Sequence, residues 1–292
     1  MPQAAPNAAD VQRIAAFSDG AQGGNPAGVW IGDALPPDAV MRRIAHEIGY
    51  SETAFAAPLG DGWRVRYFSP ESEVPFCGHA TIALGAALAA RHGDGVYALS
   101  LNDAAITVEG RRTVGPDDAL LTSAALQSPP TRSTQAPASV VESALALFGY
   151  GPIDLDPRLP PALAHGGAGH LVLALRSRAL LAAMRYELVA GRRFMRELGI
   201  VTVVLAWAET DTLFHTRNPF ASGGVYEDPA TGAGAAALAG YLRDIGWTRN
   251  WPQGRAIDIV QGEDMGMRSR LRAEIGVERG GSIRVSGTAR FL

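Results

Sequence analysis

Two segments of the chain share one design, in which a glycine-punctuated turn runs into an apolar, alanine-rich stretch. One segment starts at Pro75 and the other at Pro229, and laying Gly78 on Gly232 superposes Leu84 on Leu238 and Leu88 on Leu242. Each segment predicts a helix that is apolar on all sides and too short to span a membrane. An offset of about half the chain indicates two related domains, each with a buried central helix whose N-terminus faces a shared cleft. Chance similarity between alanine-rich helices is the alternative.

The composition is that of a globular protein and narrows the classes of function. With 292 residues, 47% of them hydrophobic and 19% charged, the chain is long enough for two domains with cores. A formal charge of −3 and a pI near 6.1 provide no basic surface, so nucleic acid and anionic membranes are poor candidates for partners.

The residue types that are missing exclude several kinds of chemistry. All 26 basic residues are arginine, so the chain has no lysine for a Schiff base with pyridoxal phosphate or for a P-loop. A single cysteine, Cys77, excludes an internal disulfide and multi-cysteine metal clusters, and it suits a reducing compartment. No secretory signal is visible at the N-terminus, and we therefore expect a cytoplasmic protein. The missing lysine and the single cysteine predict that it works without metal or coenzyme.

Hydrophobic periodicity and turn residues predict strands and helices without strict alternation, which favours an α+β fold over a doubly wound parallel sheet. Strands are expected at 11–31 (two, joined by a turn), 50–56, 63–68, 97–101, 105–109, 119–126, 170–175, 201–207, 213–218, 255–261, 271–277 and 283–291, and helices at 39–48, 138–148 and 179–198. His165 and His170 lie beside glycines and are expected in loops.

One polar segment interrupts this pattern. Residues 127–137 have almost nothing to bury, and they are the best candidate for a linker. The predicted domains are therefore 1–127 and 139–282, with the strand at 283–292 a candidate addition to the first.

Six short motifs, spread in order over nearly the whole chain, resemble the PhzF-like family, the phenazine-biosynthesis isomerases and their relatives. They are Gly24-Asn25-Pro26, Ser51-Glu52-Thr53-Ala54-Phe55, Arg66-Tyr67-Phe68-Ser69-Pro70, Glu73 to Thr81, Glu227 to Gly232, and Gln261-Gly262 with Met265-Gly266. The resemblance implies a diaminopimelate-epimerase-like fold, with two similar domains that each wrap a curved mixed sheet around a central helix. It also implies an active site between the domains and a homodimer.

Matched position by position, the resemblance assigns roles to individual residues. Glu52 corresponds to the catalytic acid/base, and His79 and Asp228 correspond to residues that assist it. The predicted substrate-binding positions are Gly78, Gly232, Thr231, Ala233 and Cys77. The assignment is chemically reasonable, because a carboxyl group among apolar neighbours in a closing cleft can take and return a proton near neutral pH. Helix N-termini that begin with glycine suit a substrate carboxylate.

Simpler interpretations exist for the same residues. Outside its motif, Glu52 would be a solvated residue of the strand at 50–56, and His79 would be a cap or core histidine. Asp228 or Thr231 can cap the second helix without any further role. Cys77 can be a small buried residue.

Two departures from the family pattern bear on the substrate. Many relatives carry serine where this chain has Ala233, so a hydroxyl that could touch the substrate is missing. Cys77 lies where related cofactor-independent racemases place one of two catalytic thiols, but Thr231 occupies the matching position in the second half. A racemase with two thiol bases is therefore excluded.

These observations predict an isomerase that moves a proton within a small carboxylate-bearing substrate. Two alternatives stay open. One is an epimerase or lyase that acts on an amino or hydroxy acid and uses Glu52 with Cys77. The other is a protein that binds a small carboxylate without turnover.

Overall fold

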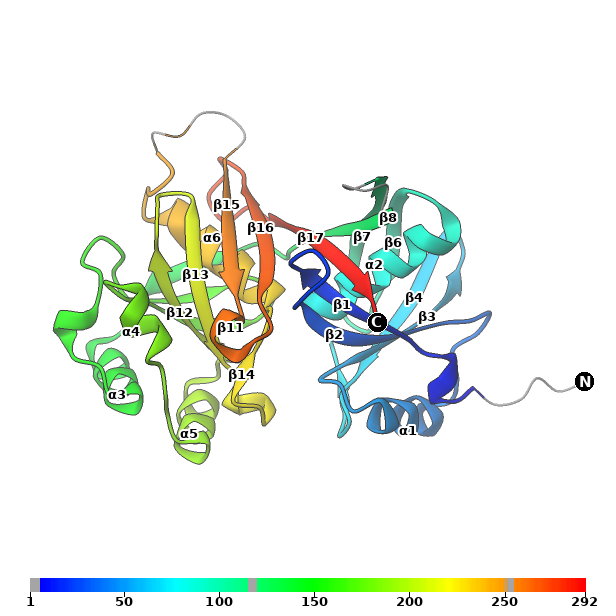
Figure 1. The fold of residues 1–292 in the computed structure, drawn as a ribbon, viewed down its shortest axis with the longest axis horizontal. Helices are drawn as coiled ribbons and strands as arrows, with labels where there is room; N and C mark the ends of the chain where they lie inside the picture. Colours follow the sequence, from blue (N-terminus) through cyan, green and yellow to red (C-terminus); the bar gives the residue numbers. More distant parts are fainter. Residues whose placement is uncertain (1–5, 115–119, 250, 252–254) are drawn as a thin grey trace, which may run out of the picture. The chain divides into compact units, whose positions relative to one another are not determined.

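The computed structural model describes residues 6–114, 120–249, 251 and 255–292 (Figure 1). The chain separates into two compact units, with Met1–Gln127 and Ser286–Leu292 in unit 1 and Ser128–Val285 in unit 2. The residues that prompted the expectation about a secretory signal, 1–5, lie outside the described residues, as does Ala119 at the start of one predicted strand.

Unit 1 is a mixed sheet that curves around one helix. Its strands are β1 (Gln12–Ser18), β2 (Asn25–Ile31), β3 (Thr53–Leu59), β4 (Gly62–Phe68), β5 (Glu73–Val74), β6 (Gly95–Ser100), β7 (Ala105–Val114), β8 (Leu120–Gln127) and the end of β17 (Ile283–Phe291); its helices are η1 (Ala8–Asp10), α1 (Asp38–Ile48) and α2 (Gly78–His92). The strand order is β17-β1-β2-β3-β4-β6-β7-β8, with β2–β3 and β4–β6 parallel and the other neighbours antiparallel. The helix α2 contacts both β1 and β8, and so the sheet wraps around it.

The central helix of unit 1 is enclosed on all sides because its side chains are small. Every residue of α2 from Gly78 to Ala89 is buried. A Cβ atom at Gly110 on β7 would collide with the backbone oxygen of Gly85 on α2, so only glycine permits this close approach. The opposite face of the sheet packs against α1 through a cluster of buried hydrophobic side chains, which includes Trp30, Met41 and Phe55.

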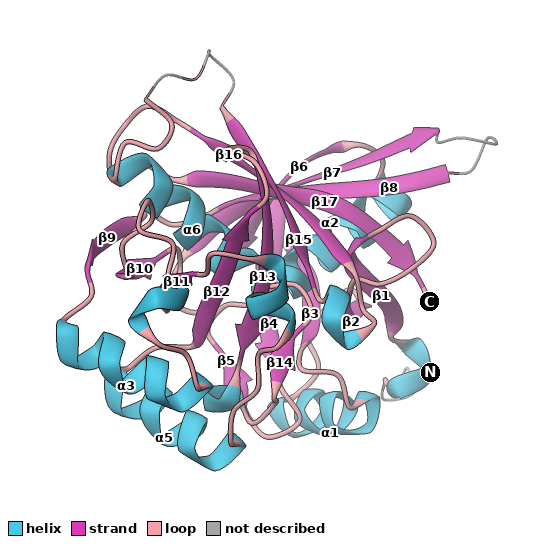
Figure 2. Cartoon of the chain, turned by 60° about the vertical axis from the view of Figure 1, so that its left-hand side comes forward, coloured by secondary structure: helices cyan, strands magenta, loops and turns pink. Residues whose placement is uncertain are grey.

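Unit 2 repeats this arrangement (Figure 2). Its strands are β9 (Arg132–Gln135), β10 (Ala162–His165), β11 (Gly169–Ala174), β12 (Thr202–Ala208), β13 (Leu213–Pro219), β14 (Glu227–Asp228), β15 (Ala256–Gln261), β16 (Ser269–Ile275) and the start of β17; its helices are α3 (Ala138–Phe148), η3 (Pro152–Asp154), α4 (Arg178–Ala182), α5 (Leu188–Leu198), η4 (Ala221–Gly223), α6 (Gly232–Asp244) and η5 (Glu263–Met265). The helix α6 contacts strands from β9 to β12 and also β16, whereas α3, α4 and α5 cover the other face of the sheet.

The two units have equivalent ladders of strand pairs. From β1 to β7 the successive pairs are antiparallel, parallel, antiparallel, parallel and antiparallel, and the same order recurs from β10 through β11, β12, β13 and β15 to β16. The helices α2 and α6 follow equivalent two-residue strands and begin at Gly78 and Gly232. The expected fold class, two similar α+β domains around central helices, is therefore confirmed.

Most of the predicted elements are present, although the segment at 179–198 forms two helices, α4 and α5, rather than one. The polar segment at 127–137 is no simple linker, because Arg132–Gln135 forms β9 and pairs along its length with β10. Its side chains are mostly exposed, so the backbone ladder rather than side-chain burial holds it. His165 lies in strand β10 rather than in a loop, and His170 lies in β11, which agrees with the strand predicted at 170–175 and not with a loop.

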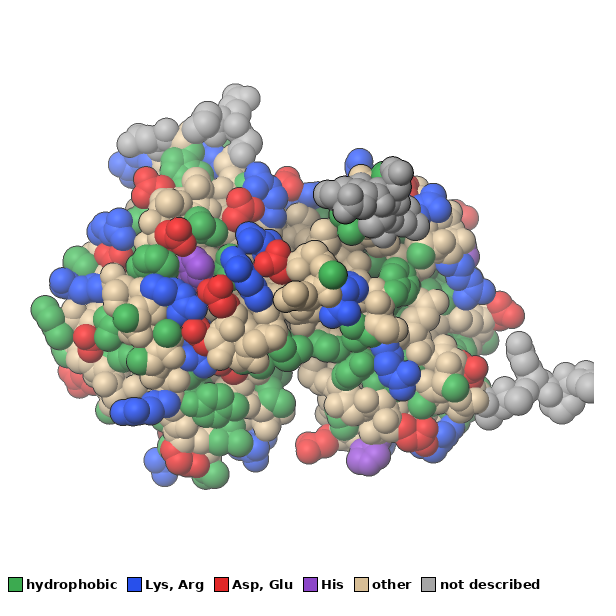
Figure 3. All heavy atoms as spheres, viewed as in Figure 1, with side chains coloured by type: hydrophobic (Ala, Val, Ile, Leu, Met, Phe, Trp, Pro, Cys, Tyr) green, Lys and Arg blue, Asp and Glu red, His purple; other side chains and the backbone are tan. Residues whose placement is uncertain are grey.

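Two further observations concern the charged side chains on the surface and the lengths of the helices. On the face shown in Figure 3, basic and acidic side chains are interspersed over each unit. In the part of the chain that the structure describes, no helix combines the length and apolarity that crossing a membrane requires.

His170 generates a prediction about stability. Its imidazole is fully buried, its Nδ1 lies 2.8 Å from the hydroxyl of Thr202, and burial lowers its pKa from 6.5 to about 3. Between these values the unfolded chain binds a proton that the folded chain does not, so the free energy of unfolding falls with acidification by about 1.4 kcal/mol per pH unit. We expect His170→Gln to remove this slope in urea titrations at pH 4–6. Thr202→Val, the control, keeps the histidine and should keep the slope; an unchanged slope in His170→Gln would contradict the prediction.

Candidate functional site

Three side chains of unit 1 converge at the start of α2. Cys77 is the N-cap residue of α2, His79 is its second residue, and Glu52 immediately precedes β3. One ligand-type atom from each of these residues lies within 4.8 Å of the other two. The periodicity predicted Glu52 within a strand at 50–56, but β3 begins only at Thr53. The carbonyl oxygen of Glu52 nevertheless accepts a hydrogen bond from the N–H of Gly28 at 3.2 Å. That bond fixes Glu52 beside β2.

His79 lies at the centre of this cluster. Its Nε2 is 3.5 Å from Oε2 of Glu52 and 3.4 Å from Oγ of Ser51, and its Nδ1 is 3.3 Å from Sγ of Cys77. The side chains of Glu52 and His79 are 12% and 7% exposed. A carboxyl group and an imidazole at this separation can exchange a proton while the surrounding protein excludes most of the water.

A chain of buried hydroxyl groups holds the N-cap backbone in place. The Thr81 hydroxyl donates to the carbonyl oxygen of Cys77 at 2.7 Å, and the Tyr67 hydroxyl lies 2.6 Å from Thr81 Oγ1. Since the proton of Thr81 is committed to Cys77, Tyr67 must donate to Thr81. Burial raises the pKa of the Tyr67 phenol well above its ordinary value, which keeps this donor protonated.

An ion-pair network anchors the segment that leads into α2. Arg66 on β4 donates from Nε and Nη2 to the carboxylate of Glu73 at 2.7 and 2.5 Å, and from Nη1 to Asp38 at 2.6 Å. The guanidinium group holds the pKa of Glu73 below its ordinary value. The two-residue strand β5, three residues before Cys77, is thereby tied to β4 and α1.

In unit 2 a second polar cluster occupies the equivalent helix start. Thr231 is the N-cap residue of α6, but its hydroxyl donates to Oδ2 of Asp228 at 2.5 Å and makes no capping bond. The expectation that the side chain of Thr231 caps the helix is therefore wrong, because its hydroxyl binds Asp228 instead. Neither α2 nor α6 has a side-chain cap hydrogen bond at its N-cap residue.

Gln261, at the end of β15, connects the parts of this second cluster. Its amide donates to the carbonyl oxygen of Asp228 at 2.7 Å and to Oγ1 of Thr231 at 2.9 Å, and its Oε1 accepts from the N–H of Thr231 at 3.1 Å. Gly262 follows with φ 73°, and a Cβ atom there would collide with the carbonyl oxygens of Met267 and Pro229. The Gln261-Gly262 motif is thus required by the turn that it braces.

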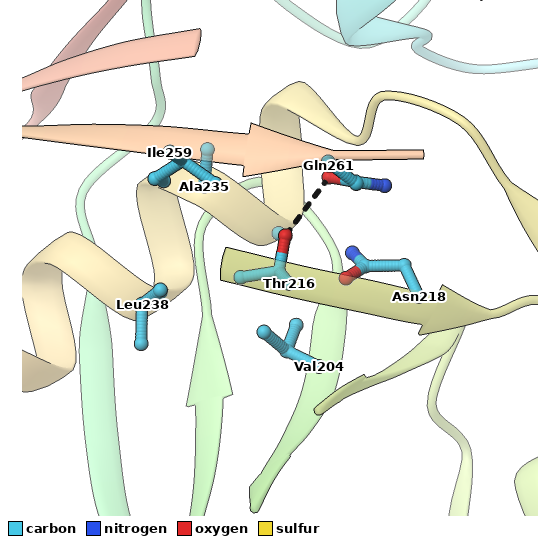
Figure 4. Close-up of a pocket in the computed structure, with 8 residues that line it drawn as sticks. Val204, Thr216, Asn218, Ala235, Leu238, Ile259 and Gln261 are labelled. Carbon is cyan, nitrogen blue, oxygen red and sulfur yellow. Dashed lines mark hydrogen bonds between the residues drawn. The ribbon is translucent and has the colours of Figure 1, made fainter. Parts of the chain in front are cut away.

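A narrow crevice lies behind this turn, with no room for a water molecule. It is lined by Val204, Thr216, Asn218, Gly234, Ala235, Leu238, Ile259 and Gln261 (Figure 4). Thr216 donates to Oε1 of Gln261 at 3.5 Å, and Asn218 lies two residues further along β13. The crevice therefore belongs to the packing of α6 on its sheet rather than to a ligand site.

The residues predicted from the sequence thus form two groups. Unit 1 brings together Glu52, Cys77, Gly78 and His79, whereas unit 2 brings together Asp228, Thr231, Gly232 and Ala233. Gly232 is buried, and Ala233 is partly exposed at the start of α6. The role of Ser51 beside His79 was missed, and so was the bracing role of Gln261. Both residues stand in the quoted motifs, which is the signal that could have identified them.

The repeated fold, with two pseudo-equivalent α/β units that each enclose a helix, defines the class of epimerase-like folds. The fold is similar to that of a Bacillus anthracis phenazine biosynthesis protein of the PhzF family, with a TM-score of 0.82, 21% identity and coverage of 97% of this chain and 96% of that one. It is also similar to that of a hydroxyproline epimerase from Agrobacterium vitis, with a TM-score of 0.59, 12% identity and coverage of 97% and 88%.

Residues 14–292 match the family model of the phenazine biosynthesis-like proteins, PhzC-PhzF, and the chain belongs to that family. A Deinococcus radiodurans protein named as an uncharacterized isomerase is 31% identical over 94% of this chain and 90% of its own length. The trans-2,3-dihydro-3-hydroxyanthranilate isomerase of Pseudomonas aeruginosa is 30% identical over 94% of each chain. The expected family and the isomerase class of activity are therefore confirmed.

Gln261 generates a prediction about the second cluster. Gln261→Glu keeps the size of the side chain but removes the amide donor. The carbonyl oxygen of Asp228 and Oγ1 of Thr231 then lose their hydrogen bonds from it, and a carboxylate is buried in its place. We expect the free energy of unfolding to fall by about 3 kcal/mol. The measurement is a urea titration with Gln135→Glu as the control, since Gln135 is exposed on β9. Equal stability of the two variants would show that Gln261 does not brace the turn.

Proposed function

We propose that the protein is an isomerase that moves a proton within a small carboxylate-bearing substrate, with Glu52 as the acid/base. The observation that carries the proposal is the 3.5 Å separation of Glu52 and His79 in a nearly buried setting at the start of α2. A carboxylate here can abstract a proton from a carbon acidified by neighbouring unsaturation and return it to another carbon of the same molecule. His79 would orient the carboxyl group or pass the proton on.

The proposed anion site is the helix start itself. The N-cap of α2 has no side-chain cap bond, and Gly78 lets a ligand approach the first N–H groups closely. The positive end of the helix dipole adds to the attraction for a carboxylate. Gly232, with Thr231 as N-cap, provides the equivalent start of α6, and Asp228 is proposed to orient polar groups of the substrate.

The proposed substrate rests on the name of one relative and on one residue of this chain that departs from the family pattern. Trans-2,3-dihydro-3-hydroxyanthranilate, named for the Pseudomonas aeruginosa relative, is the first compound to test. Ala233, at the start of α6, lacks the hydroxyl that many family members have there, which favours a substrate with one polar group fewer at this position. A homodimer is likewise proposed from the family relation alone.

A second candidate function uses Cys77 as well. Its Sγ lies 3.3 Å from Nδ1 of His79, so a thiol and a carboxyl group flank one imidazole. This arrangement would suit epimerisation or elimination on an amino or hydroxy acid, with Glu52 and Cys77 as the two proton-transfer groups. A binding protein without turnover is the third possibility.

One pair of variants separates these candidates. Glu52→Gln keeps the shape of the side chain but cannot accept a proton, so we expect turnover to fall by roughly 10²- to 10⁴-fold while substrate still binds. Cys77→Ala should retain most of the activity if Glu52 alone transfers the proton. Steady-state kinetics on both variants, with circular dichroism to verify folding, gives the ranking. Near-native turnover in Glu52→Gln would refute the proposal, and loss of turnover in folded Cys77→Ala would favour the second candidate.

Incubation in deuterated water distinguishes an enzyme from a binding protein. We expect a substrate carbon to acquire deuterium, and we expect activity to persist after exhaustive chelation, because the proposed chemistry requires only side chains of the chain. Mass spectrometry of the recovered substrate measures the label. Binding without label would indicate the non-catalytic alternative, and activity that is lost on chelation and restored by a metal ion would contradict the metal-free reaction.

A further inference from the structure

We propose that Glu52, Cys77 and His79 together form a binding site for a thiophilic divalent cation of the zinc class, and that the bound cation blocks the site. The three residues offer a carboxylate oxygen, a thiol sulfur and an imidazole nitrogen, all mutually within 4.8 Å. The start of α2 holds the backbones of Cys77 and His79, and the hydrogen bond from Gly28 holds that of Glu52.

The separations allow tetrahedral coordination around a small ion after one side chain turns. Nε2 of His79 is 3.9 Å from Sγ of Cys77 and 3.5 Å from Oε2 of Glu52. Metal–ligand bonds of about 2.0–2.3 Å at tetrahedral angles place neighbouring ligand atoms about 3.4–3.6 Å apart. Glu52 already lies at a suitable separation from Nε2, whereas Sγ of Cys77 is nearer to Nδ1 of His79, at 3.3 Å, and must turn about its Cα–Cβ bond to reach an ion held by Nε2.

The chemistry of the three donors selects the ion. A thiolate and an imidazole favour zinc and its neighbours over magnesium and calcium, which prefer oxygen ligands. Three protein ligands leave a fourth position for water, as in open zinc sites. When the ion binds, Cys77 releases its thiol proton to solvent, so the apparent affinity rises with pH.

Occupation of the cluster has a direct consequence for the proposed proton transfer. An ion bound to Oε2 of Glu52 and Nε2 of His79 removes the lone pairs that would accept the proton. The cation is thus an inhibitor rather than a cofactor. Activity should persist or rise on chelation, and it should fall as zinc is added.

The test measures an absorption band of the bound metal, because this signal does not depend on turnover. The chelator-treated full chain is titrated with Co²⁺ and with Cd²⁺, and we expect one equivalent to produce a thiolate-to-metal charge-transfer band. Cys77 is the only cysteine, so such a band reports on this residue alone. An equal concentration of Mg²⁺ should produce no band and should not compete. Absence of a band at stoichiometric cobalt and cadmium overturns the proposal.

Variants assign the ligands. We expect Cys77→Ser to abolish the band, and Glu52→Gln and His79→Gln to weaken cadmium binding by about 100-fold or more, at least the loss caused by removing an outer-shell partner of a metal. His46→Gln, on the exposed side of α1, is the matched control and should bind as the parent does.

Equal binding by the parent, Glu52→Gln and His79→Gln would mean that the thiol alone captures the ion, which overturns the site. If Cys77→Ser does not fold, Glu52→Gln still decides, because it keeps the thiol. A catalyst that is inactive without cation but shows the band would overturn both the metal-free reaction and the inhibitory role of the ion, while the ligand set would stand.

Discussion

Enclosing a helix within a curved sheet is the constraint on which both units depend. A helix contacted by strands on several sides can carry only small side chains where the backbones meet, and Gly85 against Gly110 is the tightest such approach in the part of unit 1 that the structure describes. The same requirement explains the alanine- and glycine-rich sequence of α6. Because the enclosed helix cannot shift, its first turn is held rigidly, and side chains at Cys77 and His79 inherit that rigidity.

Much of this architecture could be predicted because local chemistry and tertiary structure agree. The central helices begin at the glycines that mark their starts, and α1 ends at Gly49 in the left-handed conformation that glycine favours. The strand β9 was not predictable in the same way, since its exposed polar side chains carry no periodic signal and its pairing with β10 depends on residues about 30 positions away. His170 misled for a related reason. A histidine beside a glycine is typical of loops, and only the sheet supplies its burial and its contact with Thr202.

The contacts of individual side chains in the candidate site could be predicted from the sequence only in part. The motifs identified Glu52 and His79, but not that Nε2 of His79 lies between Glu52 and Ser51 while Nδ1 lies beside Cys77. The N-cap rule correctly placed Thr231 at the start of α6, yet the hydroxyl donates to Asp228 and accepts from the amide of Gln261 instead of capping the helix. Such competition among partners is decided by residues from distant strands, which spacing along the chain does not record.

The strand β17 has a consequence for the order in which the protein can assemble. Its final residues, Ser286–Leu292, belong to unit 1, where Ile14 of β1 pairs with Phe291. As the chain emerges from a ribosome, the first unit therefore lacks one neighbour for β1 until residues 286–292 have been made, although domains commonly fold in the order of their synthesis. The first half of the chain must wait with an open sheet edge, a state that favours unwanted pairing with other strands. Folding of unit 1 in a nascent chain should thus be completed only after unit 2 has been synthesised.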